Sequence, residues 1–247
     1  MTLFLIVLFV AGIWAGVQNA LAGGGSFVTL PALMISGLDA RAANITSTLA
    51  LFPAQAATGL TGRRNVSGAA GLSFAQLVWI SLVGGVAGAA LLLVTPSNFF
   101  AYLVPWLVLF ATVVFAWGSF FRRESPKPHL GAMGAGVTQF LISVYGGYFG
   151  GGIGFLMLAA LSAAGLAVRP AAATKNVLAA VMNASAVAIF VFSPAVHWHE
   201  AIISCAGAVI GGIIGGLLLT RINEKALRIA VVAIGAVLTI GLFLHAP

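Results

Sequence analysis

Two clusters of polar side chains recur about half a chain length apart, each inside a long apolar stretch. The first cluster is Thr46-Ser47-Thr48 and the second is Thr174-Lys175-Asn176. Gln55 and Asn183 occupy equivalent places further along the two stretches. Hydroxyl, amide and ammonium groups together can hold an anion, and Lys175 would contribute most of the charge. A lysine that snorkels to a membrane interface is the alternative interpretation.

A glycine triplet precedes each polar cluster. Gly23-Gly24-Gly25 is followed by Ser26 in the first half, and Gly150-Gly151-Gly152 opens the same pattern in the second. A helix that starts after such a triplet exposes unpaired N–H groups and the positive end of its dipole, which together attract an anion. Paired glycine-interrupted segments in two halves of a membrane chain are typical of a transporter's central site. Glycines that only let helices pack closely are the alternative.

Each motif also contains an arginine, Arg41 in the first half and Arg169 in the second. These arginines could anchor loops or act as charge partners of a bound anion. The predicted substrate-binding residues, in addition to these two charge partners, are Gly23, Gly24, Gly25, Ser26, Thr46, Ser47, Gln55, Gly150, Gly151, Gly152, Thr174, Lys175, Asn176 and Asn183.

The composition places these motifs in a membrane protein. Hydrophobic residues make up 61% of the 247 residues and charged residues only 6%, against roughly 25% charged residues in an ordinary soluble domain. Uncharged stretches, such as the one from Asn65 to Phe121, are longer than the roughly 20 residues with which a helix crosses a bilayer. The alternation typical of a transmembrane β-barrel is missing. The predicted fold class is therefore all-α, a polytopic integral membrane protein.

The net charge of +7 indicates orientation in the membrane rather than binding of nucleic acid. Basic residues gather at Arg63-Arg64, in 122–127 and in 221–228, and loops rich in lysine and arginine lie in the cytoplasm. Two other loops, Thr95–Asn98 and Ser193–Glu200, contain no lysine or arginine and are predicted to lie outside. Both termini are also predicted to lie outside. Equivalent loops then face opposite sides, so the sequence predicts inverted repeats with an odd number of crossings each.

Five apolar segments can be recognised in each half. They span 2–21, 27–36, 42–61, 72–94 and 99–120, and then 130–148, 153–164, 170–192, 200–219 and 226–245. Segments 2 and 7 are too short to cross a bilayer, so we expect short or broken helices there. The predicted domains are a first transmembrane repeat over 1–121, a cytoplasmic linker over 122–129 and a second, inverted repeat over 130–247.

A family resemblance follows from these motifs. A glycine triplet with Pro31 downstream is followed by Ala43-Asn44-Ile45-Thr46-Ser47, the pattern recurs after a basic linker, and the glycine-rich stretches Gly84–Gly88 and Gly211–Gly216 precede the last segment of each half. With these features the chain resembles, over essentially its whole length, the sulfite exporter TauE/SafE family. The resemblance implies secondary export of small sulfur-containing anions such as sulfite, sulfoacetate or other organosulfonates. The second copy departs from the pattern, because Pro31 has no clear counterpart and Lys175 replaces Ser47.

Other classes of function have less support in the sequence. The acidic residues Asp39, Glu124, Glu200 and Glu224 show no spacing that would pair two of them on one helix face, so we do not expect an enzyme. His197 and His199 beside Glu200 are better explained by a solvated loop than by a metal site. An anion channel is the alternative function, because a pore could use the same helix starts and basic side chains. A non-transporting membrane subunit is a third hypothesis.

The expected partners are the small anionic substrate and the lipid bilayer of the cell inner (plasma) membrane, without nucleic acid, metal or cofactor. The sequence leaves a homo-oligomer open.

Overall fold

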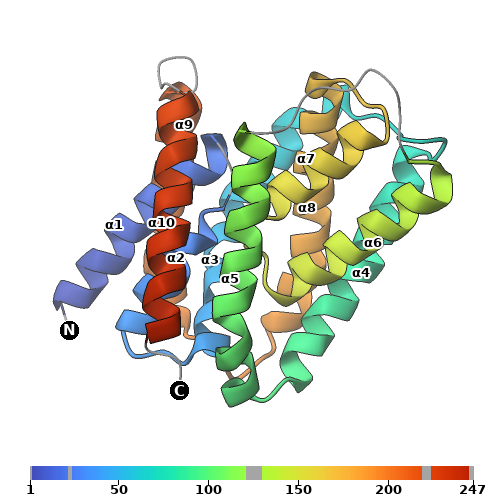
Figure 1. The fold of residues 1–247 in the computed structure, drawn as a ribbon. Coiled ribbons are helices and arrows are strands. Elements are labelled where there is room, and N and C mark those ends of the chain that lie inside the picture. The colour runs from blue at the N-terminus through green and yellow to red at the C-terminus, as the bar shows by residue number, and fades with distance from the viewer. Residues whose placement is uncertain (1, 22–23, 121–129, 219–223, 245–247) are drawn as a thin grey trace.

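The computed structural model describes residues 2–21, 24–120, 130–218 and 224–244, and the predicted linker 122–129 and Gly23 lie outside these ranges. The described residues form ten α-helices and one short 3-10 turn, with no β-strand among them (Figure 1). The helices are α1 (Thr2–Leu21), α2 (Ser26–Ile35), α3 (Ala40–Gly62), α4 (Phe74–Val94), α5 (Ser97–Phe120), α6 (Ala132–Tyr148), α7 (Ile153–Ala163), α8 (Val168–Phe190), α9 (Trp198–Leu218) and α10 (Glu224–Leu244). The predicted all-α fold class is confirmed.

Five of the described helices, α1, α4, α5, α8 and α9, are long and apolar enough to cross a membrane. By contrast, α2 and α7 have only 10 and 11 residues. At 1.5 Å per residue, helices of this length reach about half way across the hydrocarbon core. The chain is therefore a polytopic membrane protein with a short helix at the second place in each half.

The two short helices end in the same type of turn. Gly37 and Gly165 have φ angles of +106° and +93°, a left-handed conformation that glycine adopts without steric cost. In each turn the glycine N–H donates to a carbonyl three residues back, Gly37 to Met34 and Gly165 to Ser162, at 3.0 Å. Each turn leads into a helix of 23 residues, α3 or α8. The turns therefore place α3 and α8 in equivalent positions after the short helices.

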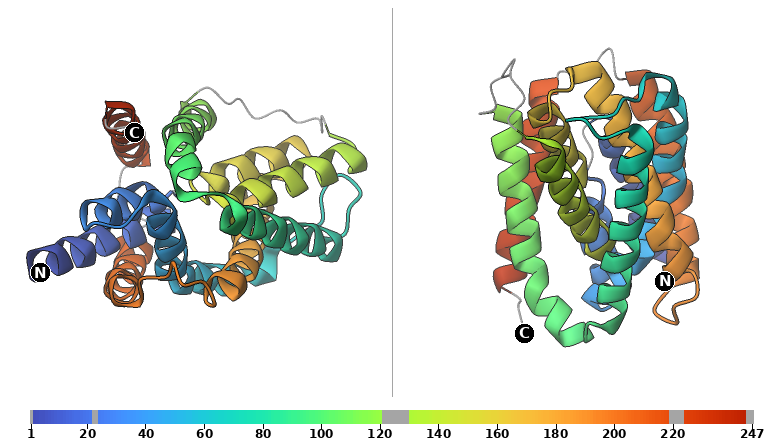
Figure 2. Two further views of the ribbon diagram at one scale, coloured as in Figure 1. Left: turned by 90° about the horizontal axis from the view of Figure 1, so that it is seen from below. Right: turned by 90° about the vertical axis from the view of Figure 1, so that its right-hand side faces the viewer.

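The helices pack into two groups that each combine both halves of the chain. In bundle A, α1, α2 and α3 pack with α9, and in bundle B, α6, α7 and α8 pack with α4. The same helix pairs occur in both bundles. The contacts α1–α9, α3–α9, α1–α2, α2–α3 and α1–α3 of bundle A correspond to α6–α4, α8–α4, α6–α7, α7–α8 and α6–α8 of bundle B. The bundles meet where α3 packs on α8, and α5 packs along α10 beside them (Figure 2).

Glycines allow the closest helix contacts within each bundle. A Cβ atom on Gly16 of α1 would meet the carbonyl oxygen of Ala208 on α9, and one on Gly88 of α4 would meet that of Val144 on α6. Close backbone approach through small residues is a common source of helix association in membranes. The glycine-rich stretches of α4 and α9 thus hold together helices from opposite halves of the sequence.

Equivalent helices run in opposite directions: α1 against α6, α3 against α8, α4 against α9 and α5 against α10 (Figures 1 and 2). The connection 63–73 lies at one end of the molecule, named here the Arg63 end, together with the turn after α7. The connection 191–197 lies at the opposite end, named the His197 end, together with the turn after α2 and the connection between α4 and α5. Helix α1 begins and α10 ends toward the His197 end. Which end faces the cytoplasm stays a prediction.

Candidate functional site

The crossing of α3 and α8 brings two of the predicted residues into direct contact. Asn183 Nδ2 donates a hydrogen bond to Gln55 Oε1, and the two residues are 128 positions apart. The same spacing separates Thr46 from Thr174 and Arg41 from Arg169. The Gln55–Asn183 contact joins α3 and α8 where the two bundles meet.

A small cavity lies at this crossing. It is lined by Ser26, Ser47, Thr48, Leu51, Gln55, Phe149, Gly150 and Asn183. About 20 Å³ of the cavity is open to the centre of a water molecule, which is room for one water but not for a larger oxyanion. Binding of an oxyanion here would require the surrounding helices to separate.

Five of the predicted substrate-binding residues line this cavity: Ser26, Ser47, Gln55, Gly150 and Asn183. Among the other lining residues, Leu51 could have been found from helical spacing, because it lies four residues from both Ser47 and Gln55 on the same face of α3. Phe149 gave no such signal, since it belongs to the connection before α7. The first-half hydroxyls also contact each other, with Ser47 Oγ 2.5 Å from Thr29 Oγ1.

A carbonyl oxygen of each glycine triplet accepts a hydrogen bond from a side chain of the preceding helix. Gln18 Nε2 donates to the carbonyl oxygen of Gly24, and the Tyr145 hydroxyl donates to that of Gly151, both at 2.9 Å and both from six residues upstream. Gly24 and Gly152 have left-handed φ angles of +81° and +73°. Gln18 and Tyr145 were not among the predicted site residues, although both are polar groups in apolar segments.

Two further contacts hold the backbone next to the triplets. The Gly25 N–H donates to Asn19 Oδ1 at 2.7 Å, so this donor is already used within the protein. Asn44 Nδ2 donates to the carbonyl oxygen of Tyr148 at 3.0 Å and ties α3 to the end of α6. The asparagine in the Ala-Asn-Ile-Thr-Ser motif thus supports the connection whose residues Phe149 and Gly150 line the cavity.

Lys175 lies beside the start of α7 rather than on the cavity wall. Its Nζ is 3.7 Å from the place that a Cβ atom on Gly154 would take, and the side chain is half-buried. In the part of the chain that the structure describes, the Lys175 ammonium makes no hydrogen bond and no ion pair. The ion pair found there joins His197 to Glu200, at 3.9 Å. An ammonium group beside a helix N-terminus concentrates positive charge, which an anion would offset.

The predicted arginines lie away from the crossing. Arg41 Nη1 donates to the carbonyl oxygens of Leu93 and Thr95, at 3.3 and 2.9 Å, and so caps the end of α4 at the His197 end. Arg169 is exposed at the start of α8, at the Arg63 end. The structure therefore gives Arg41 an anchoring contact and gives neither arginine a contact with the cavity.

Other predicted residues hold the protein's own backbone or lie near the crossing. Thr46 and Thr174 contact connections between helices, Gly151 accepts from Tyr145, and Gly152 packs against Ala111. Asn176 is half-buried on α8, next to Lys175.

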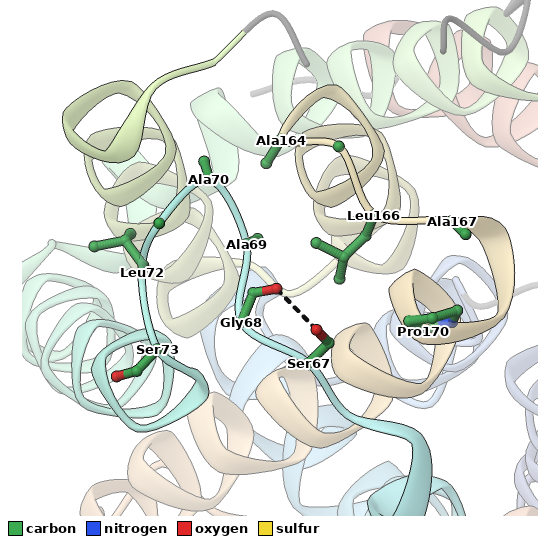
Figure 3. Close-up of a pocket in the computed structure, with 12 residues that line it drawn as sticks. Ser67, Gly68, Ala69, Ala70, Leu72, Ser73, Ala164, Leu166, Ala167 and Pro170 are labelled. Carbon is green, nitrogen blue, oxygen red and sulfur yellow. Dashed lines mark hydrogen bonds between the residues drawn. The ribbon is translucent and has the colours of Figure 1, made fainter. Parts of the chain in front are cut away.

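A larger hollow opens at the Arg63 end. It has a volume of about 650 Å³ and lies between the connections 67–73 and 164–170 (Figure 3). Leu166 projects into it, and Ser67 lies on its wall with its hydroxyl bonded to the Gly68 carbonyl oxygen at 3.1 Å. The hollow carries no charged side chain among its lining residues, so it offers space without selecting a charge.

The sequence matches the model of the sulfite exporter TauE/SafE family over residues 8–242. The chain belongs to this family. A similar protein is ORF9 of Sinorhizobium sp, named a probable membrane transporter protein, with 29% identity over 96% of this chain and 92% of that protein. Probable membrane transporter proteins of Haemophilus influenzae and, as YfcA, of Escherichia coli K12 are each 28% identical. Their alignments cover 95% and 96% of this chain and 92% and 88% of those proteins.

Membership of the TauE/SafE family agrees with the apolar helices of the fold, and together they identify a multi-pass membrane transporter. The family motif residues Ala43–Ser47 lie on α3, and the glycine-rich stretches of the resemblance lie on α4 and α9. The family assignment from the sequence is confirmed.

Proposed function

We propose that this chain is a secondary carrier that exports a small sulfur-containing anion, such as sulfite, sulfoacetate or another organosulfonate, across the cell inner membrane. The observation that carries the proposal is the position of Lys175. Its ammonium lies beside the start of α7 with no carboxylate partner in the described residues. The family description supports sulfite as the first substrate to test.

The anion is proposed to bind between the two glycine-rich motifs, where α2 and α7 begin. Ser26 at the start of α2 and Gly150 before α7 line the same cavity. The positive end of α2 therefore reaches the cavity, and the connection that leads into α7 lies on its wall, which disfavours a cation. Ser47, Gln55 and Asn183 would supply neutral hydrogen-bonding groups to the anion.

We further propose that the two halves are inverted repeats which expose the site alternately to the two sides of the membrane. The opposite directions of equivalent helices and the contact between equivalent residues Gln55 and Asn183 support this arrangement. The small size of the cavity favours a carrier over an anion channel, because an open pore needs a continuous hydrated path.

Binding to the purified protein in detergent tests the substrate class. Sulfite, kept free of oxygen because it oxidises to sulfate, should bind saturably, and sulfoacetate should compete with it. Methylammonium, a cation of similar size, is the matched control and should not compete. Equal binding of methylammonium and sulfite would contradict the proposal.

A further inference from the structure

Thr174 joins the site helix α8 to the connection between the two bundles at the Arg63 end. Its hydroxyl accepts from the Ser67 N–H at 2.9 Å and lies 3.3 Å from the Ser67 carbonyl oxygen, to which it can donate. Thr174 is fully buried and directly precedes Lys175. Ser67 lies on the wall of the 650 Å³ hollow. The threonine therefore links a residue on the wall of the hollow to the helix that carries Lys175 and Asn183.

Thr46 makes the matching contact at the His197 end. Its hydroxyl accepts from the His197 N–H at 3.2 Å, and the residue is fully buried on α3 directly before Ser47. The two contacts tie connections of the same kind: 63–73 leads from α3 in bundle A to α4 in bundle B, and 191–197 leads from α8 in bundle B to α9 in bundle A.

These connections must adjust whenever bundle A moves relative to bundle B. Glycine contacts hold α1 against α9 and α4 against α6 at backbone distance, and Gly59 of α3 lies against Ala180 of α8 where the bundles meet. A movement of one bundle against the other would therefore take place at the α3–α8 contact. Each threonine pins one connection to a helix that carries site residues. A shift of α8 at Lys175 would lengthen the hydrogen bond of Thr174 to Ser67, and a shift of α3 at Ser47 would lengthen that of Thr46 to His197.

We infer that Thr174 and Thr46 are paired positioning residues of the transport cycle: Thr174 keeps the site closed toward the Arg63 end, and Thr46 keeps it closed toward the His197 end. This inference rests on the proposed carrier function. Both contacts are formed in the structure, and the central cavity is correspondingly small. Release of one contact at a time would open the site to one side of the membrane.

One reporter tests both threonines without any substrate. Ser26, which lines the cavity, is changed to cysteine in a Cys205→Ala background, since Cys205 is the chain's single cysteine. Membranes are then exposed from one side at a time to the impermeant reagent sulfonatoethyl methanethiosulfonate, and the labelling rate is measured. Thr174→Val and Thr46→Val keep the side-chain shape and remove the hydroxyl, and Thr→Ser at each position is the conservative control.

Thr174→Val should raise the labelling rate about five-fold or more from the Arg63 side only, and Thr46→Val should do so from the His197 side only. The serine variants should restore the parent rates. If Thr174→Val fails to insert, Thr174→Ala is read in the same way. No acceleration, or equal acceleration from both sides, would overturn the inference. A side-specific change without any sulfite binding would instead retain the positioning role and reject the proposed substrate.

Discussion

Lys175 and Ser47 occupy equivalent positions at which the two halves have diverged. If one anion is held between the motifs, Lys175 supplies charge from the second half and Ser47 a hydroxyl from the first. Loss of a charged partner costs roughly 3 to 5 kcal/mol, against about 1 kcal/mol for a neutral hydrogen bond. Lys175→Ala should therefore weaken sulfite binding and transport far more than Ser47→Ala does, as measured by affinity and initial flux.

Arg169→Ala is the control for Lys175→Ala, because Arg169 is a basic residue on the same helix but exposed. It should leave flux close to that of the parent protein. Normal transport by Lys175→Ala would contradict a role of Lys175 in holding the anion. Lys175 would then only anchor α8 at the membrane interface, and the helix starts would supply the positive charge.

The Tyr145 hydroxyl holds the connection before α7 through its hydrogen bond to the Gly151 carbonyl oxygen. Tyr145→Phe removes only the hydroxyl and should loosen the turn before α7, weakening sulfite binding about five-fold for one hydrogen bond of about 1 kcal/mol. Tyr102→Phe, at a tyrosine exposed on α5, is the matched control and should bind like the parent. Equal affinities of the two variants for sulfite would show that the Tyr145–Gly151 hydrogen bond does not position the site.

Equivalent residues of the two halves could be predicted from the sequence, whereas the residues that they contact could not. Matching the two halves predicted that Gln55 and Asn183 are equivalent, and the structure brings both to one crossing. The partners of Thr46 and Thr174 could not be found in this way. Ser67 is 107 positions from Thr174, and a hydroxyl in an apolar segment has the same sequence signal whether it contacts a ligand or a distant backbone.

Among the helices, positions along the chain were predictable and packing partners were not. Uncharged runs bounded by glycine, proline or basic loops gave bounds within a few residues of those in the structure, including the short α2 and α7. Nothing in the apolar periodicity indicated that α1 packs on α9 from the other half. The glycine spacing in both helices is compatible with many partners, because any helix with small residues can approach as closely.

The packing of α1 on α9 gives a prediction for stability. Gly16→Ala places a Cβ atom 2.7 Å from the Gly212 nitrogen and against the Ala208 carbonyl oxygen, so overpacking should destabilise the fold by about 1–3 kcal/mol. Gly118→Ala on α5 is the matched control and should be neutral or stabilising, because within the described residues nothing beyond its own helix turn lies within 4 Å of the added Cβ. The thermal midpoint in detergent measures both. A lower midpoint for Gly118→Ala alone would contradict the assigned contact.

For the whole molecule, the charge of the loops predicts the orientation in the membrane. Arg63 and Arg123 should face the cytoplasm, and His197 and both termini should lie outside, because basic loops stay inside. Arg123 lies outside the described residues, whereas the connections 63–73 and 191–197 lie at opposite ends of the molecule (Figure 1). Cysteine labelling in intact cells at positions 63 and 197 measures this. Labelling of both positions from the same side would rule out the inverted-repeat arrangement.

Each bundle contains one helix from the other half of the sequence. Bundle A takes α9 from the second half and bundle B takes α4 from the first, so neither half forms its bundle alone. Units that move during transport are then expected to be the bundles rather than residues 1–121 and 130–247. This distinction could not be made from the sequence, in which the basic linker is the only visible boundary.

Uptake of labelled sulfite into proteoliposomes, with and without a pH gradient, shows whether the chain carries a small sulfur-containing anion. The initial rate should saturate with sulfite concentration, fall when sulfoacetate competes, stay unchanged with methylammonium and drop strongly in Lys175→Ala. Uptake equal to that of protein-free liposomes would contradict sulfite transport, and a rate that rises linearly without saturation would contradict a carrier and favour an anion channel.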